Sequence, residues 1–209
     1  MKGRLKQLMF CVLLLVFIGS GILAAAPEVP PPGVTEAARQ GLSNYPGLTG
    51  AQLGFGFRVY TVSPVELMEC PVMESLVIPT DMWRFVVDSN GRSTALLTVA
   101  LVDGQWRAVS VGGAGLAVEM SRVMETWPQK DGCSHRFIRI YQARADFVEI
   151  SKKGNAAESG YVPMTASRMV LELEGPFDPG TLLTGTEIIP PLREIVSKSR
   201  QMPELLRHQ

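Results

Sequence analysis

The strongest hydrophobic pattern in the chain is a set of three strand-like runs between residues 82 and 111. The runs read MWRFVV, STALLTVALV and QWRAVSV, and they are rich in β-branched and aromatic residues. Between them stand Asn90-Gly91 and Asp103-Gly104, pairs that tolerate the positive φ of tight hairpin turns. The pattern predicts an antiparallel meander over residues 82–111.

A helical pattern follows the meander. Between residues 115 and 127, apolar residues recur every three or four positions and therefore share one face of an α-helix. Glu119, Arg122 and Glu125 lie on the other side, and Pro128 stops the helix. We expect this amphipathic helix, residues 115–127, to cover one face of the sheet.

Shorter strand patterns complete the body of the chain. They occupy residues 53–62, 135–142, 145–151 and 167–174, and a polar loop at 152–160 separates the last two. A helix is the alternative for the run at 144–150. Together the patterns predict an α+β domain in which an antiparallel sheet of about five or six strands carries one main helix on one face.

Proline-rich segments mark both ends of the predicted domain. Residues 26–50 combine a stiff, extended spacer with a short helix that begins at Thr35. The globular domain is expected at residues 51–177. Residues 178–209 read as a proline-rich tail, in which another short helix begins at Pro191.

Residues 1–25 have the organisation of a signal peptide. Basic residues precede a long apolar run, and the small residues around Ala24 suit a signal peptidase. The uncharged stretch at 8–26 is also long enough to span a bilayer, so an uncleaved membrane anchor is the alternative. In either case the remaining chain is expected to be exported: secreted, periplasmic, or tethered to the membrane and facing outward.

Export changes how the cysteines are interpreted. Cys11 lies inside the N-terminal apolar run and counts as one more hydrophobic residue. Cys70 and Cys133 are left as a pair in the exported part, where an even pair favours a structural disulfide bond. Closing this loop would stabilise the domain by about 4 kcal/mol in the chain-entropy model.

Charge adds one exclusion. The chain has a formal net charge of +0 and 19% charged residues, and the leader is purely basic, so the exported part is mildly acidic. A nucleic-acid partner is therefore not expected, because such proteins need a basic surface. Arg136, Arg139 and Arg144 come nearest to one, but their spacing is typical of a solvated strand edge. Membrane contact is expected only through the N-terminal segment.

The glycine-rich stretch VSVGGAGLAVEM, residues 109–120, invites comparison with a phosphate-binding loop. Gly113 and Gly115 fit the first two glycines of the dinucleotide motif, but Val118 occupies the third. The preceding strand also belongs to a hairpin, whereas the motif requires a parallel βαβ unit. We expect a strand-to-helix connection here, and no cofactor.

Catalytic residues are scarce. His135 is the single histidine of the body, and it could serve a hydrolase only together with Cys70 or Ser110 as the nucleophile. No G-x-S-x-G elbow accompanies Ser110. A metal site is not expected either, because acidic residues such as Asp88 and Asp103 belong to turns. We therefore assign no catalytic residues.

The tryptophans are the remaining binding candidates. Trp83 and Trp106 are expected on adjacent hairpin strands, and Trp127 on the apolar face of the predicted helix. They could line a carbohydrate or peptide groove, although packing in the core is the more ordinary role for such residues. A tryptophan that proves to be exposed would be the first candidate for a binding site.

The sequence thus favours an exported, non-enzymatic module that binds a protein or a cell-envelope partner. A secreted hydrolase that uses His135 with Cys70 or Ser110 is the first alternative. An inhibitor or a folding assistant for another exported protein is the second.

Overall fold

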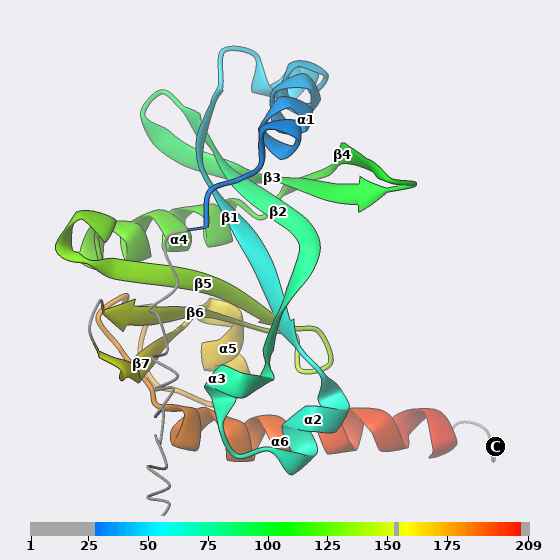
Figure 1. The fold of residues 1–209 in the computed structure, drawn as a ribbon, viewed down its shortest axis with the longest axis vertical. Coiled ribbons are helices and arrows are strands. Elements are labelled where there is room, and N and C mark those ends of the chain that lie inside the picture. Colours follow the sequence, from blue (N-terminus) through cyan, green and yellow to red (C-terminus); the bar gives the residue numbers. More distant parts are fainter. Residues whose placement is uncertain (1–27, 153–154, 206–209) are drawn as a thin grey trace, which may run out of the picture.

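A mixed sheet organises the computed structural model, which describes residues 28–152 and 155–205 (Figure 1). Its strands are β1 (Gln52–Val62), β2 (Val77–Ser89), β3 (Arg92–Val102), β4 (Gln105–Gly112), β5 (Cys133–Ile140), β6 (Ala145–Lys152) and β7 (Asn155–Pro163). They lie in the order β4-β3-β2-β1-β5-β6-β7, and every neighbouring pair is antiparallel except β1 and β5. The α+β class and the meander are confirmed, but the 7 strands exceed the about five or six expected.

Helices cover both faces of the sheet. The long ones are α1 (Pro32–Ser43), α4 (Ala114–Thr126) and α6 (Gly185–Leu205), and the short ones are α2 (Pro64–Glu69), α3 (Met73–Leu76) and α5 (Thr165–Val170). The 3₁₀ turns are η1 (Pro46–Leu48) and η2 (Gln129–Asp131). The predicted helix is confirmed as α4, but it is not the only long one. No helix in the described ranges is long and apolar enough to cross a membrane, and the predicted leader, residues 1–25, lies outside these ranges.

Strand β2 shows how the two faces are divided. Trp83 and Phe85 point into the cluster beneath α1, while Val86 points to the opposite face and meets Ala117 of α4. Val77, at the other end of β2, joins the cluster that α6 covers. Figure 1 shows α1 at the β4 end of the sheet and α6 across the β5–β7 end. Thus α1 and α6 share one face, and α4 covers the other.

The glycine-rich stretch connects β4 to α4, as predicted. Gly113 precedes the first turn of α4 with a φ of 67°, in the left-handed region that glycine adopts without steric cost. Strand β4 is antiparallel to β3, so the stretch does not belong to a parallel βαβ unit. On its inner face, α4 buries Ala117, Met120 and Val123.

The segment predicted as an extended spacer forms the start of α1 instead. Pro32 begins the helix, where its missing N–H would have no helical partner. Gly41 lies in the last turn of α1, and the helix packs so closely on β4 there that a Cβ on Gly41 would stand 2.1 Å from the Ala108 Cβ. Val34 and Ala38 are fully buried, so this segment belongs to the folded body.

The C-terminal helix is longer than predicted and completes the core. Thr184 caps α6, and its backbone N–H and hydroxyl donate to the Glu187 carboxylate at 2.7 and 2.8 Å. Ile188, Leu192 and Val196 follow at one-turn spacing and are fully buried. Residues that the sequence placed in a tail therefore form part of the core.

The segment after β6 differs most from the prediction. Residues assigned to a loop form β7, and the predicted strand at 167–174 forms α5 and the turn after it. Side-chain hydrogen bonds hold this turn: the Ser167 hydroxyl donates to the Asp146 carbonyl of β6, and the Arg168 guanidinium donates to the Glu174 carbonyl within the turn. Alternation of apolar residues does not reveal such bonds.

Candidate functional site

The two tryptophans singled out from the sequence lie in the core. Trp83 on β2 is 2% exposed, and Trp106 on β4 is half-buried; both pack in the cluster beneath α1. They do not stand on adjacent strands, because β3 separates β2 from β4. Trp127, which follows the last residue of α4, has a different position and lines a groove.

The expected disulfide is absent, and both cysteines are free thiols. Cys70 follows α2 and packs against the cluster that α6 covers. Cys133 begins β5 and is buried in the cluster beneath α4. These clusters lie on opposite faces of the sheet, since the successive β5 residues Phe137 and Ile138 point one into each. The sheet itself therefore separates the two sulfur atoms.

The structure does not bring the hydrolase candidates together. Ser110 is exposed on β4, and His135 is on β5, with three strands between them, so about 20 Å of sheet separates them. Cys70 is on the opposite face from His135, which shares the Phe137 face of β5. His135 therefore has neither expected nucleophile within reach.

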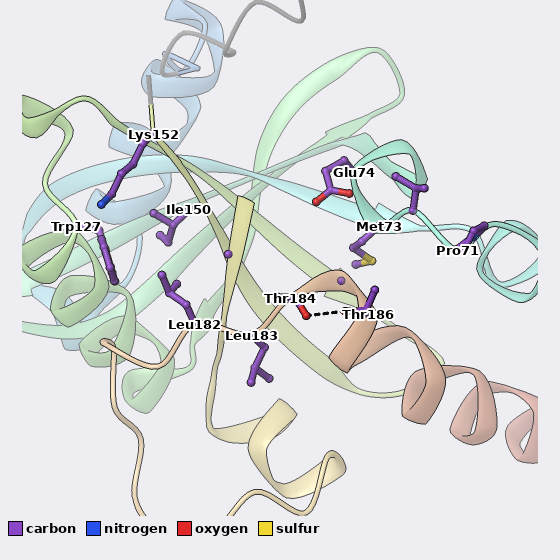
Figure 2. Close-up of a pocket in the computed structure, with 13 residues that line it drawn as sticks. Pro71, Met73, Glu74, Trp127, Ile150, Lys152, Leu182, Leu183, Thr184 and Thr186 are labelled. Carbon is purple, nitrogen blue, oxygen red and sulfur yellow. Dashed lines mark hydrogen bonds between the residues drawn. The ribbon is translucent and has the colours of Figure 1, made fainter. Parts of the chain in front are cut away.

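A groove of about 550 Å³ lies where α3, β6 and the segment before α6 meet the end of α4. We call it the Trp127 groove. Its apolar walls come from four separate segments: Trp127 after α4, Ile150 on β6, Met73 on α3, and Leu182 and Leu183 before α6. Figure 2 shows Trp127 and Ile150 on one side, Met73 on the other, and the two leucines between them. Leu182 is 40% exposed and offers apolar surface to solvent.

Opposite charges border the Trp127 groove. The Lys152 ammonium stands over the Trp127 ring, 5.5 Å from its centroid, in a cation–π contact. Across the groove, the Glu74 carboxylate accepts a 3.0 Å hydrogen bond from the Tyr161 hydroxyl (Figure 2 labels Lys152 and Glu74). Burial, reinforced by the Glu149 and Glu74 carboxylates, raises the pKa of Tyr161 well above its ordinary value. Tyr161 therefore stays a neutral donor and orients Glu74.

Hydrogen bonds fix the walls of the groove in place. The Trp127 indole N–H donates to the Pro179 carbonyl at 2.8 Å, which ties α4 to the segment before α6. Tyr161 and Leu183 exchange backbone hydrogen bonds of 2.8 and 3.0 Å, so this segment adds a short bridge to the edge of β7. The groove is thus formed by backbone and core contacts before any ligand arrives.

The arrangement is suited to holding a ligand. Apolar walls and a few placed polar groups are the features that bind and orient a ligand. Sequence reasoning missed Lys152, Leu182 and Leu183, because they come from segments with no shared local pattern. The one available signal was Trp127, as a large aromatic residue at the end of an amphipathic helix.

Metal-binding capacity and likeness to known proteins complete the description of the site. Within residues 28–152 and 155–205, no three His, Cys, Asp or Glu side chains cluster in a way that could hold a metal ion. Comparisons of the chain with protein-family models, curated proteins and solved structures found no match, so the geometry alone supports the functional proposal.

Proposed function

We propose that the protein is an exported, non-enzymatic binding module that holds an extended segment of a partner protein in the Trp127 groove. The observation that carries this proposal is the groove itself, with a volume of about 550 Å³, apolar walls and one charge on each side. Concave, mostly apolar surfaces with a few convergent polar groups are the usual form of binding sites.

The chemistry of the walls matches an extended peptide. Trp127, Ile150 and Leu182 supply surface for apolar side chains, while Lys152 and Glu74, at opposite sides, are placed to bind charged or hydrogen-bonding groups of the peptide. Because the walls are already ordered, binding would not require the protein to fold around its ligand, and less free energy is lost on association. An inhibitor or a folding assistant would use the same surface and differ only in its partner.

Site-specific photo-crosslinking tests the proposal. A benzophenone amino acid replaces Leu182 at the groove, and in a control protein it replaces Val109 on β4, which has a similar exposure of 46% against 40%. We expect Leu182 to give one discrete crosslinked protein in producing cells, and Val109 to give none.

A charge variant shows whether that crosslink depends on the groove. Lys152→Glu should reduce the Leu182 crosslink several-fold, whereas Arg107→Glu on the exposed part of β4 should leave it unchanged. Equal crosslinking from Leu182 and Val109, or a Leu182 crosslink that survives Lys152→Glu undiminished, would contradict the proposal. Loss of the crosslink in His135→Ala alone would instead favour a role for the histidine.

A further inference from the structure

Two arginine side chains converge on the sheet face that α4 covers. Strand β1 lies between β2 and β5, and it pairs in parallel with β5 at two residue pairs, Val59↔Phe137 and Tyr60↔Ile138. Across this short pairing, the Arg84 guanidinium of β2 stands over the Phe137 ring of β5, 5.4 Å from its centroid. Arg139 follows Phe137 by two residues on β5 and therefore shares its face of the strand.

Contacts along β5 and β6 hold Arg139 in place. Its guanidinium stands over the Tyr141 ring, 5.6 Å from the centroid. The register of the two strands pairs Arg139 with Asp146, and Arg139 Nη1 is 3.7 Å from the Asp146 carboxylate. The Arg139 side chain is 31% exposed and Arg84 is half-buried, so a ligand from solvent can reach both guanidinium groups.

The positive charge of this pair is incompletely balanced. The distance of 3.7 Å between Arg139 and Asp146 is longer than the about 2.7–2.9 Å of a charge-assisted hydrogen bond. Asp146 is 6% exposed, and its Oδ1 has no hydrogen-bond partner among the described residues. The buried Nε of Arg84 also has none within that part of the chain. Two guanidinium groups thus share one loosely paired carboxylate.

The pKa shifts agree with an unmet need for negative charge. Burial, and then the charge of Arg139, lower the pKa of Arg84, and the Asp146 carboxylate compensates only in part. Burial raises the pKa of Asp146 in spite of both guanidinium groups. Glu119 is near Asp146 as well, but it is engaged elsewhere, because the backbone N–H of Thr165 donates to it at 3.1 Å.

A carboxylate fits this pair of arginines. A guanidinium presents parallel N–H donors that match the two oxygen atoms of a carboxylate. Cation–π contacts with Phe137 and Tyr141 hold the two guanidinium groups, and Tyr141 is 46% exposed, so it offers ring surface beside them. A singly charged ligand would balance the extra positive charge, whereas a phosphate would place a second negative charge beside the buried Asp146.

We propose that Arg84 and Arg139 form a binding site for the carboxylate of an aromatic or apolar organic acid. The site is separate from the Trp127 groove, because Asp146 at its border precedes Ile150 of the groove by four residues on β6, or about 13 Å. The sequence indicated a solvated strand edge for Arg139, whereas β5 lies in the interior of the sheet.

Titration of the full chain with benzoate tests the proposal, and benzamide is the neutral control of almost the same shape. Isotope-labelled arginine reports contact through the NMR signals of its side chain. We expect millimolar benzoate to shift the Arg84 and Arg139 signals saturably, and to leave Arg107, which is exposed on β4, unchanged. Benzamide should shift none of them. Inorganic phosphate should bind at least tenfold more weakly than benzoate.

Matched variants identify the groups that bind. Asp146→Asn removes the competing negative charge at nearly constant shape and should strengthen benzoate binding several-fold. Arg84→Lys keeps the charge but loses the paired donors, so it should weaken binding at least tenfold, whereas Arg107→Lys should not. If Arg84→Lys does not fold, Arg139→Lys makes the same comparison. The absence of a saturable shift, equal shifts with benzamide, a preference for phosphate, or an unchanged affinity in Asp146→Asn would each overturn the proposal.

Discussion

Two ion pairs of almost equal length differ in their surroundings. The Arg136 guanidinium donates to Glu149 at 2.5 and 2.7 Å, and the Glu149 carboxylate is only 3% exposed. The Lys198 ammonium meets Glu194 at 2.6 Å, but both side chains are more than 60% exposed. From contact distance alone, the two ion pairs would be expected to stabilise the fold equally. Their burial differs, and a buried pair is much more costly to break than an exposed one.

We predict that Glu149→Ala lowers the free energy of unfolding by about 3 kcal/mol, because it leaves a largely buried guanidinium without its partner. Glu194→Ala should have little effect, because water already solvates both of its charges. Urea unfolding of the two variants beside the wild type measures the difference. An equal decrease in the free energy of unfolding for the two variants would show that burial does not determine how much each ion pair contributes to stability.

His135 predicts a pH dependence of stability. Burial lowers its pKa in the folded state below the ordinary value, so between the two values the unfolded chain binds a proton that the folded chain does not. The free energy of unfolding should therefore decrease as the pH falls below about 6.5, until the folded-state pKa is reached. Urea unfolding at several pH values between neutral and mildly acidic conditions should show a shallower decrease for His135→Gln.

His208→Gln is the matched control for this measurement. It removes the other histidine of the chain, which is close to the C-terminus and outside the described residues. Carboxylates contribute the same pH dependence to every variant, so the comparison isolates the imidazole. A His135→Gln curve parallel to the wild type would contradict the lowered pKa.

At the scale of elements, α1 depends on its close approach to β4. Gly41→Ala would place a methyl group 2.1 Å from the Ala108 Cβ, so the helix must shift outward. We expect a loss of about 1–3 kcal/mol in the free energy of unfolding, as for overpacked cores. Gly47→Ala is the control, because a Cβ there meets nothing within 4 Å. Thermal unfolding measures the stability of both variants. Equal unfolding temperatures for Gly41→Ala and Gly47→Ala would be inconsistent with the close packing of α1 on β4.

Elements with local signals could be predicted, and those held by distant contacts could not. The hairpins have turn residues that accept positive φ, with Asn90 at 52° and Asp103 at 51°, and α4 has a complete amphipathic period. Strand β7 and helix α5 depend instead on bonds to β6, such as that from Ser167. The start of α6 did have a local signal, the Thr184-x-x-Glu187 capping pattern, which the proline-rich composition obscured.

At the scale of the whole molecule, the candidate groove lay beyond sequence reasoning. Its walls meet only when β6, α3 and the segment before α6 are assembled, and no periodicity links them. The Cys70–Cys133 pairing shows the same limit, since an even count of cysteines carries no information about which face of a sheet each occupies. The sequence did favour a core position for Trp83 and Trp106, because large hydrophobic residues on strands are usually buried.

The thiols provide a test of the global arrangement. A hydrogen bond with the Ser75 hydroxyl lowers the pKa of Cys70, which is partly exposed, whereas Cys133 is 5% exposed. We predict that a maleimide labels Cys70 within the native protein and Cys133 only after unfolding, as identified by mass spectrometry of peptides. Recovery of Cys70 and Cys133 as one disulfide-linked peptide from the native protein would contradict the arrangement of the two faces.

The narrow parallel pairing of β1 with β5 has a consequence for the order of folding. On either side of it, strands pair with near neighbours in the chain, so each half can form through small loops at low entropic cost. Across it, the Thr61 hydroxyl and the Arg139 carbonyl meet over a separation of 78 residues. The hairpins should therefore assemble as two early cooperative units, and this seam of two residue pairs should close last and open first.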